Sequence, residues 1–335
     1  MSVAAENRQV LAGDIGGTKT NLALYSQGKT RPVPRIIVSY SSRGASDLET
    51  IVAQFLEKHP ARITDACFAI AGPVIDGRCK TTNLPWDVSE SRLKRRFGWD
   101  VRLINDLTAT GLGIPLLYHR ERYPLNTARP RKGENIALIA PGTGLGTSVL
   151  ICQEGKYVPI ASEGGHVDFA PTDETEALLW RYMYQHYGHV SIERIVSGMG
   201  LFNIFSFMKD SGRHRVPEWL TRDIEKGDPG RAISEAAIKR NDPLCKDVLR
   251  IFTSILGSIA GNLALTVLAT GGVYLGGGIP PKILPALADG AFMNAFSNKG
   301  RFRDILENIS VRVILNDHAA ILGAAHCALT KTRET

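Results

Sequence analysis

Two copies of one short device constrain the fold of this chain more than any other feature of its sequence. Each copy is an apolar strand, a glycine turn that carries a threonine, and a second strand that returns. Glycine lets backbone N–H groups approach a ligand closely, and successive N–H groups that point one way bind anions. The repetition predicts two lobes that face one phosphate-bearing ligand, although each turn alone would also fit an ordinary tight hairpin. The turns lie at Gly13, Asp14, Ile15, Gly16, Gly17 and Thr18, and at Gly142, Thr143 and Gly144.

Strands and helices alternate along most of the chain. Short apolar runs that end in turn residues predict strands at 66–71, 101–104, 135–140, 273–275 and 311–315. Helical periodicity covers 48–56, 90–97, 174–187, most of 192–270, and 319–329. Ser46 and Glu49 have the spacing of a capping box, so we expect Ser46 to begin the first helix. This alternation predicts α/β layers with a largely parallel or mixed sheet.

Length, cysteine content and charge narrow the class of protein. With 335 residues the chain exceeds the size at which one hydrophobic core usually stops growing, so we expect two domains. Five scattered cysteines without a C-x-x-C pair disfavour a zinc site and fit a reducing compartment. The polar N-terminal segment does not resemble a signal peptide, so we expect a cytoplasmic protein. The net charge of +7 indicates solvated surface near an anion site, because the sequence lacks the patterns of nucleic-acid binding.

Residues 251–281 carry no charged side chain and are long enough to span a bilayer. Polar residues between Thr253 and Thr266 nevertheless interrupt the apolar surface, and Gly271 and Gly272 end the predicted helix. A helix that is only partly apolar around its circumference fits a protein core better than lipid. We therefore expect a buried core helix and no membrane segment.

The surroundings of the glycine turns indicate the ligand. Asp14 ends its strand beside the first turn, where a carboxylate would repel bound phosphates unless a cation intervened, so it implies Mg²⁺ held through water. The sequence has neither the Walker pattern nor the G-x-G-x-x-G pattern between a strand and a helix, which disfavours P-loop and dinucleotide sites. A third glycine cluster, at Gly276, Gly277 and Gly278, follows another strand. Three backbone-rich sites suit the triphosphate and the adenosine of one ATP.

Polar residues elsewhere suit a substrate with hydroxyl groups. Asp106 follows Asn105 at the end of a predicted strand, where it would serve as general base in phosphoryl transfer to a hydroxyl, or only as the cap of the next helix. Glu163 and His166 lie in a glycine-rich loop and would bind neighbouring sugar hydroxyls, because a carboxylate accepts protons and histidine donates or accepts. Glu193 would add a further acceptor, or it would be an exposed carboxylate at a helix start.

Taken together, these motifs resemble the bacterial glucokinase family, within the superfamily of hexokinases, actin and heat-shock ATPases. The Glu-Gly-Gly-His-Val-Asp-Phe run from Glu163 and the Glu-Arg-Ile-Val-Ser-Gly run from Glu193 are highly specific. The resemblance covers nearly the whole chain. Its carriers are Gly13–Thr18, Leu103–Ala109, Gly142–Gly146, Glu163–Pro171, Glu193–Gly198 and Gly276–Gly278.

The resemblance implies a two-lobed actin-like or RNase H-like α/β fold of the hexokinase type, with mixed sheets flanked by helices. It implies a small domain of residues 1–116 plus 317–335, a large domain of residues 117–316, and an active site in the cleft between them. It also implies ATP-dependent phosphorylation of the 6-hydroxyl of D-glucose with Asp106 as catalytic base, and a homodimer. The residues implied to hold glucose are Asn105, Asp106, Glu163, His166 and Glu193. Those implied to hold ATP are Gly13, Asp14, Ile15, Gly16, Gly17, Thr18, Gly142, Thr143, Gly144, Gly276, Gly277 and Gly278.

One residue departs from the family pattern. Lys19 makes the first turn look like the related repressor, open-reading-frame and kinase group. That group carries a Cys-rich zinc motif after its Glu-Gly-x-x-His loop, whereas Val167–Asp173 contains no cysteine, which favours the glucokinase side. The alternatives that stay open are a kinase for another hexose or N-acetylhexosamine, a non-catalytic sugar sensor, a chaperone-type ATPase, and ADP or polyphosphate as donor.

Overall fold

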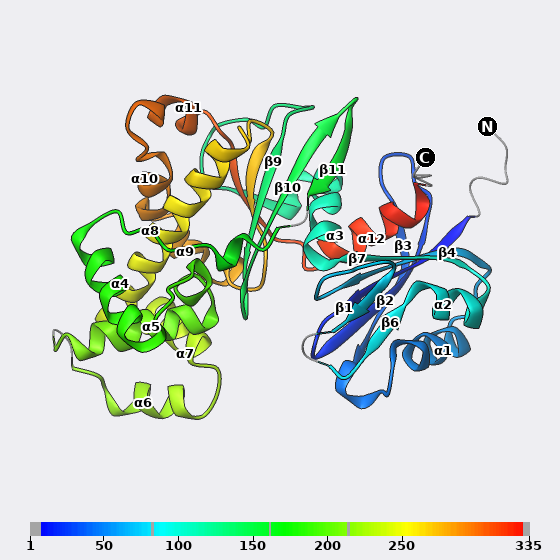
Figure 1. Cartoon of the computed structure of the whole chain (residues 1–335), viewed down its shortest axis with the longest axis horizontal. Coiled ribbons are helices and arrows are strands. Elements are labelled where there is room, and N and C mark those ends of the chain that lie inside the picture. The colour runs from blue at the N-terminus through cyan, green and yellow to red at the C-terminus, as the bar shows by residue number, and fades with distance from the viewer. Residues whose placement is uncertain (1–7, 82–83, 161, 213–214, 331–335) are drawn as a thin grey trace. The chain divides into compact units, whose positions relative to one another are not determined.

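The structure, a computed structural model, describes residues 8–81, 84–160, 162–212 and 215–330. Figure 1 shows the chain as two compact units. Unit 1 comprises Met1–His119, Tyr157–Ala161 and Asn316–Thr335. Unit 2 comprises Arg120–Lys156 and Ser162–Leu315. Each unit is described by itself below.

A mixed five-stranded sheet forms the centre of unit 1. β1 pairs with β2 in antiparallel sense and with β4 in parallel sense, and β4 pairs with β7 in parallel sense. Ile15 lies opposite Ile70, and Ile70 lies opposite Asn105, so the three parallel strands end at one edge of the sheet. This register brings the first glycine turn and Asp106 to the same edge. In spatial order the strands are β3 (Val33–Ser41), β2 (Lys19–Ser26), β1 (Gln9–Ile15), β4 (Ile63–Ile70) and β7 (Asp100–Asn105).

Helices cover both faces of this sheet. α1 (Leu48–Lys58) and α2 (Glu90–Phe97) share a core with alternate sheet residues such as Phe68, while α12 (Ala319–Leu329) contacts β1 and β4 on the other side (Figure 1). α3 (Asp106–Gly113), which continues into the 3₁₀ turn Ile114–Leu116, packs tightly against α12. A Cβ atom added to Gly323 would lie 1.8 Å from the carbonyl oxygen of Ala109. The helix that begins at Asp106 is therefore fixed by the last helix of the chain.

The sheet of unit 2 repeats this arrangement. β9 pairs with β10 in antiparallel sense and with β12 in parallel sense, and β12 pairs with β13 in parallel sense. These relations are the same as those of β1, β2, β4 and β7, which confirms the duplicated device and the two-lobed α/β fold. In spatial order the strands within unit 2 are β10 (Leu145–Gln153), β9 (Ile136–Pro141), β12 (Gly272–Leu275), β13 (Val311–Ile314) and β8 (Arg122–Pro124). The strand β11 (Lys156–Ile160) falls, except for its first residue, in the Tyr157–Ala161 segment of unit 1.

One large hydrophobic core joins this sheet to the helices of unit 2. Its centre is α8, the single described helix that is long and apolar enough to cross a membrane, and most of its apolar stretch is buried inside the unit. The G-x-x-x-G spacing serves packing against α10, because a Cβ atom at Gly257 or Gly261 would lie 2.2 or 2.4 Å from a carbonyl oxygen of α10. This packing supports the core-helix interpretation. The helices are α4 (Glu174–Tyr187), α5 (Gly198–Asp210), α6 (Glu218–Glu225), α7 (Pro229–Lys239), α8 (Pro243–Thr266), α9 (Leu284–Leu287), α10 (Ala291–Ser297) and α11 (Arg303–Glu307).

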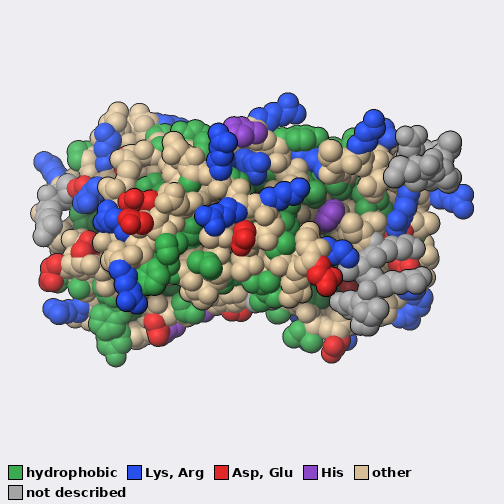
Figure 2. Space-filling model, turned by 90° about the horizontal axis from the view of Figure 1, so that it is seen from above, with side chains coloured by type: hydrophobic (Ala, Val, Ile, Leu, Met, Phe, Trp, Pro, Cys, Tyr) green, Lys and Arg blue, Asp and Glu red, His purple; other side chains and the backbone are tan. Residues whose placement is uncertain are grey.

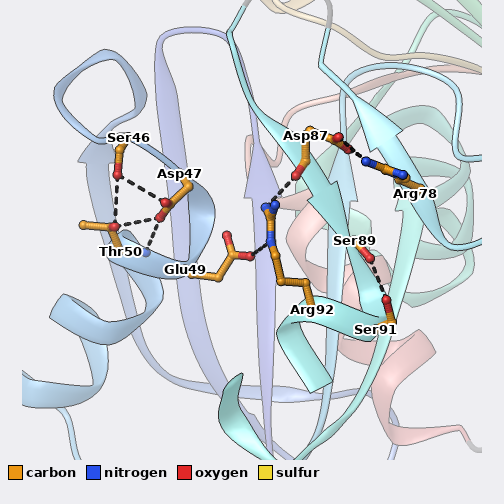
Figure 3. A network of polar contacts seen from close by, with 9 residues as sticks. All are labelled: Ser46, Asp47, Glu49, Thr50, Arg78, Asp87, Ser89, Ser91 and Arg92. Carbon is orange, nitrogen blue, oxygen red and sulfur yellow. Dashed lines mark hydrogen bonds and ion pairs between the residues drawn. The ribbon is translucent and has the colours of Figure 1, made fainter. Parts of the chain in front are cut away.

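The start of α1 differs from the expected capping box (Figure 3). The N-cap is Asp47, whose carboxylate accepts hydrogen bonds from the backbone N–H of Thr50 at 2.8 Å and from its hydroxyl at 2.6 Å. Glu49 does not reach back to the cap, because it forms an ion pair with Arg92 of α2. The prediction of Ser46 as the first residue was therefore wrong by one position. The short pair β5 (Arg78–Lys80) and β6 (Asp87–Ser89) was not expected from the sequence.

Basic side chains are distributed over the surface. On the face shown in Figure 2, Lys and Arg side chains stand among neutral and acidic groups. This distribution fits the solvated basic surface that the net charge of +7 indicates.

Candidate active site

The first glycine turn closes the hairpin between β1 and β2 in unit 1. The backbone N–H of Gly16 donates to the carbonyl of Lys19 at 2.9 Å. Ser42, just after β3, holds the turn from outside: its hydroxyl donates to the carbonyl of Gly16 at 2.8 Å, and its N–H donates to the carbonyl of Thr18 at 2.9 Å. Ser42 is fully buried, as is Thr20, whose hydroxyl lies 2.9 Å from that of Ser42. This support could not be predicted from the sequence, because a lone serine after a strand is commonplace.

Gly13 and Gly16 have different surroundings. A Cβ atom on Gly13 would lie 2.4 Å from a ring carbon of Phe68 on β4, so this glycine allows two neighbouring strands to pack. A Cβ atom on Gly16 would lie 3.2 Å from the carbonyl oxygen of Lys19 within the turn itself. Glycine at position 16 therefore relieves crowding within the turn, and glycine at position 13 relieves crowding between strands.

Two carboxylates, those of Asp14 and Asp106, lie at the same edge of the sheet in unit 1. Asp14 accepts a hydrogen bond from the side chain of Asn21 at 3.4 Å. Burial raises the pKa of Asp14, and the Asn21 hydrogen bond and the charge of His318 oppose that rise. Burial likewise raises the pKa of Asp106 to about 6; a hydrogen bond from the Leu107 N–H opposes this rise, and the charge of Asp14 adds to it. Asp106 is thus ionised at neutral pH and is a stronger base than an exposed aspartate.

Asn105, and not Asp106, caps helix α3. Its side-chain oxygen accepts hydrogen bonds from the N–H groups of Leu107 at 2.9 Å and Thr108 at 3.3 Å. Its side-chain nitrogen donates to the carbonyl of Gly72 at 3.2 Å. The simpler interpretation of Asp106 as the N-cap is therefore wrong. The amide nitrogen of Asn105 keeps one N–H for a ligand, because a primary amide has two.

The second glycine turn lies between β9 and β10 in unit 2. The N–H of Gly142 donates to the carbonyl of Gly144 at 2.8 Å, and the N–H of Gly198, the first residue of α5, donates to the carbonyl of Gly142 at 2.8 Å. The Glu193 carboxylate accepts a hydrogen bond from the N–H of Leu145 through Oε2 at 2.8 Å. A Cβ atom on Gly144 would lie 2.5 Å from the same oxygen. Glu193 is therefore half-buried against the turn and is not a freely exposed carboxylate.

The three glycines after β12 divide into structural and open positions. The N–H of Gly276 continues the ladder to the carbonyl of Ile139 at 2.8 Å. Gly277 has a φ of +77°, and a Cβ atom there would lie 2.4 Å from the carbonyl oxygen of Pro141, so only glycine fits. A Cβ atom on Gly278 would have no neighbour within 4 Å. Gly278 is therefore the member of the cluster that leaves space for a ligand.

A cavity of about 510 Å³ lies in unit 2 beside this open glycine. We call it the larger cavity. Gly142, Thr143 and Gly278 line it together with the first residues of α5 and α7 and with the Lys282 side chain. The N-terminus of a helix presents unpaired N–H groups and favours negative charge. The larger cavity thus combines glycine turns, two helix N-termini and a cation.

A second cavity of about 290 Å³, the smaller cavity, also lies in unit 2. His166 and Glu193 line it, so the structure brings together two of the three residues expected in this unit to bind a sugar. Glu163 is exposed and lies at the start of the 3₁₀ turn Gly164–His166. The smaller cavity shares Thr143 and Met199 with the larger one, so the two adjoin at the second glycine turn.

A short backbone pairing holds the sugar-loop residues together. The N–H of Phe169 donates to the carbonyl of Val190 at 2.9 Å, and the N–H of Ile192 donates to the carbonyl of Val167 at 3.0 Å. Beside it, His189 Nε2 lies 2.9 Å from the Asp168 carboxylate. The pairing links the loop of His166 to the 3₁₀ turn Ile192–Arg194, which carries Glu193. Sequence reasoning missed His189, which lines the smaller cavity.

Comparison with known proteins decides the family. A family model described as Glucokinase matches residues 11–331. The chain belongs to the glucokinase family. Its reaction is therefore the ATP-dependent phosphorylation of glucose.

Relatives of similar length support this membership. The glucokinase of Nostoc punctiforme is 41% identical over 95% of this chain and 98% of its own length. That of Synechocystis is 42% identical over 95% of this chain and 97% of its own length. Among solved structures, a glucokinase from an Antarctic psychrotroph superimposes with a TM-score of 0.86 at 29% identity, over 96% of this chain and 98% of that one. The predicted hexokinase-type fold is confirmed.

Proposed function

We propose that Asp106 acts as general base when this enzyme transfers the γ-phosphoryl group of ATP to the 6-hydroxyl of D-glucose. The observation that carries this proposal is the position of Asp106 at the sheet edge where the first glycine turn also lies. Burial there raises the pKa of Asp106 to about 6. A base with this pKa is ionised at neutral pH and still takes a proton from an alcohol as the new phosphate ester forms. The tight contact between α3 and α12 would hold its carboxylate in place.

The larger cavity is proposed to take the adenosine of ATP. Its volume of about 510 Å³ lies within the range of small-molecule sites. The phosphates would follow the glycine turns, because the N–H groups there and the N-termini of α5 and α7 favour negative charge. Lys282 at the cavity wall would add a positive charge.

The smaller cavity is proposed to hold the sugar side of the reaction. His166 would donate or accept a hydrogen bond with a sugar hydroxyl. Oε2 of Glu193 already accepts from Leu145, which leaves Oε1 as the free acceptor for a hydroxyl. Glu163, on the same loop as His166, would supply a further acceptor for a sugar hydroxyl. In unit 1, the second N–H of the Asn105 side chain is proposed separately as a donor to the sugar. Because the two cavities adjoin at Thr143, a sugar hydroxyl and a donor phosphate would meet there.

Asp14 fits a role beside a magnesium ion that accompanies the nucleotide. No described residues form a group of three or more His, Cys, Asp or Glu side chains suited to a resident metal. Mg²⁺ is usually held by one or two carboxylates plus substrate phosphates and water, which matches the half-buried carboxylate of Asp14 at the sheet edge. When bound, the ion would neutralise phosphate charge. Asp14 would hold the ion through water.

Gly278→Ala tests the assignment of the nucleotide cavity. The added methyl group has no protein neighbour within 4 Å, so the fold and its melting temperature should not change. If the cavity holds ATP, the methyl group enters space needed by the ligand, and KM for ATP should rise about tenfold while KM for glucose stays the same.

Gly227→Ala is the matched control, because a Cβ atom there also has no neighbour within 4 Å and Gly227 does not line the larger cavity. An unchanged KM for ATP in Gly278→Ala would remove the assignment. A panel of sugars and phosphoryl donors tests substrate choice: a preference for another hexose, or for ADP or polyphosphate, would replace glucose or ATP in the proposal.

A further inference from the structure

Two cysteines and one arginine gather on the side of the unit 1 sheet that α12 covers. Cys67 on β4 lies directly opposite Arg102 on β7 in the strand register. Its neighbours Ala66 and Phe68 belong to the core under α1 and α2, so the alternation of the strand turns Cys67 toward α12. The guanidinium of Arg102 donates to Sγ of Cys327 on α12 at 3.5 Å. Strand pairing and helix packing therefore bring both thiols beside one cation.

The two thiols differ in ionisation and access. A hydrogen bond from the Cys67 thiol lowers the pKa of Cys327 to about 7; burial opposes this shift, Arg102 adds to it, and the charge of Glu90 opposes it weakly. Burial and the same hydrogen bond raise the pKa of Cys67 well above its ordinary value. Cys327 is 8% exposed and Cys67 is 0% exposed. Cys327 is thus the thiolate that an oxidant meets first, and Cys67 is a thiol held beside it.

We propose that Cys67 and Cys327 form a redox-active dithiol that hydroperoxides oxidise to a disulfide between β4 and α12. The site takes a small peroxide as its co-substrate, and it is independent of the phosphoryl-transfer chemistry.

The chemistry balances in two steps. The Cys327 thiolate attacks one peroxide oxygen, the O–O bond breaks, and the product is a sulfenic acid plus hydroxide, which a proton converts to water. The Cys67 sulfur then attacks the sulfenic sulfur, the S–O bond breaks, and the Cys67 proton leaves with the hydroxide as a second water. The two thiols lose two electrons in total, and the peroxide gains them. A dithiol reductant reverses the reaction.

The other described cysteines lack this combination. Burial raises the pKa of Cys79 and raises that of Cys245 to a greater extent, and nearby Asp106 and Asp242, respectively, add to the rise. Both thiols are therefore held in the unreactive protonated form. Cys152 is half-buried in β10 of unit 2, and no hydrogen bond to its sulfur is present among the described residues. Selective oxidation at Cys327 is expected for these reasons.

The test uses the full-length enzyme treated with hydrogen peroxide and then with trypsin. The wild type should lose about 2 Da and yield a peptide pair joined through Cys67 and Cys327, and dithiothreitol should release that pair. Cys67→Ser should stop at the sulfenic acid, which dimedone traps on Cys327. Cys152→Ser is the matched control and should oxidise as the wild type does.

Arg102→Met keeps both thiols and removes the cation together with its hydrogen bonds to Cys327 Sγ and to the carbonyl of Thr330, so it tests the mechanism without deleting a cysteine. Its disulfide should form at least several-fold more slowly at pH 7, because less Cys327 is thiolate. Circular dichroism and a melting curve would establish that this variant is folded. A wild type without the Cys67–Cys327 peptide pair would overturn the proposal, as would equal oxidation rates in a folded Arg102→Met variant.

Discussion

Asp106→Asn should make the protein more stable while it removes most of the activity. In the folded chain burial raises the pKa of this carboxyl from 3.8 to about 6. A carboxyl whose folded pKa is raised costs stability at every pH above its unfolded pKa, because the unfolded chain holds the ionised form more readily. Above pH 6 both states are ionised and the whole cost is present. It amounts to about 3 kcal/mol at pH 7.

The pH dependence of this gain is the decisive measurement. The cost falls as pH drops through 6, because the folded state then binds the proton, and it vanishes only well below 3.8, where the unfolded state binds it too. At pH 4 it should be about 0.6 kcal/mol. Urea titrations of wild type and Asp106→Asn at pH 7 and pH 4 give the two differences directly. A coupled assay should show kcat reduced about 10² to 10⁴-fold, since the general base is lost.

Asp317→Asn is the control, because Asp317 is an exposed carboxylate of the same unit. It should change stability little at either pH. If Asp106→Asn gave no stabilisation at pH 7, or the same stabilisation at pH 7 and pH 4, burial would not be the origin of the raised pKa. Near-normal kcat would remove the assignment of Asp106 as base.

Further predictions follow from the same geometry. The acid limb of the kcat profile should fall near pH 6, so that turnover at pH 5 is about a tenth of its plateau; a limb near pH 4 would contradict the raised pKa of Asp106. Gly323→Ala should destabilise unit 1 by about 1–3 kcal/mol and lower kcat, since its Cβ would lie 1.8 Å from the Ala109 oxygen and must push α3 away; a normal melting temperature and kcat would contradict this. Ser42→Ala should raise KM for ATP more than KM for glucose, because it frees one side of the first turn; equal effects would contradict that support. Sedimentation velocity should give a species of twice 36.5 kDa, and a monomer at all concentrations would exclude the homodimer.

Much of the fold could be predicted from local pattern. α2, α4 and α12 have the bounds that the sequence predicts, and a glycine follows α2 and α4. Both glycine turns lie in antiparallel hairpins, because a strand, a short glycine turn and a second apolar strand in direct succession favour a β-hairpin. The N-cap of α1 was predicted at the wrong residue. Asp47 caps the helix in place of Ser46, because Glu49 forms an ion pair with Arg92 and does not complete the capping box. Arg92 lies 43 residues from Glu49 in the sequence, so the pattern of neighbouring residues does not predict this ion pair.

The site was only partly readable for the same reason. Residue type identified Asp106, Glu193 and His166 as candidate site residues. It did not distinguish Gly277, where the backbone requires glycine, from Gly278, which lines the larger cavity. That distinction depends on a carbonyl of Pro141 on another strand. The raised pKa of Asp106 depends on burial, which no single-residue pattern reports.

The hydrogen bond between Glu193 and Leu145 limits how this enzyme can acquire a new sugar preference. Any replacement that shortens the side chain at position 193 to admit a bulkier sugar would also release the loop proposed to carry the donor phosphates. Substitutions that alter sugar specificity are therefore expected at the exposed Glu163 and His166, where a change does not affect the loop proposed to carry the donor phosphates.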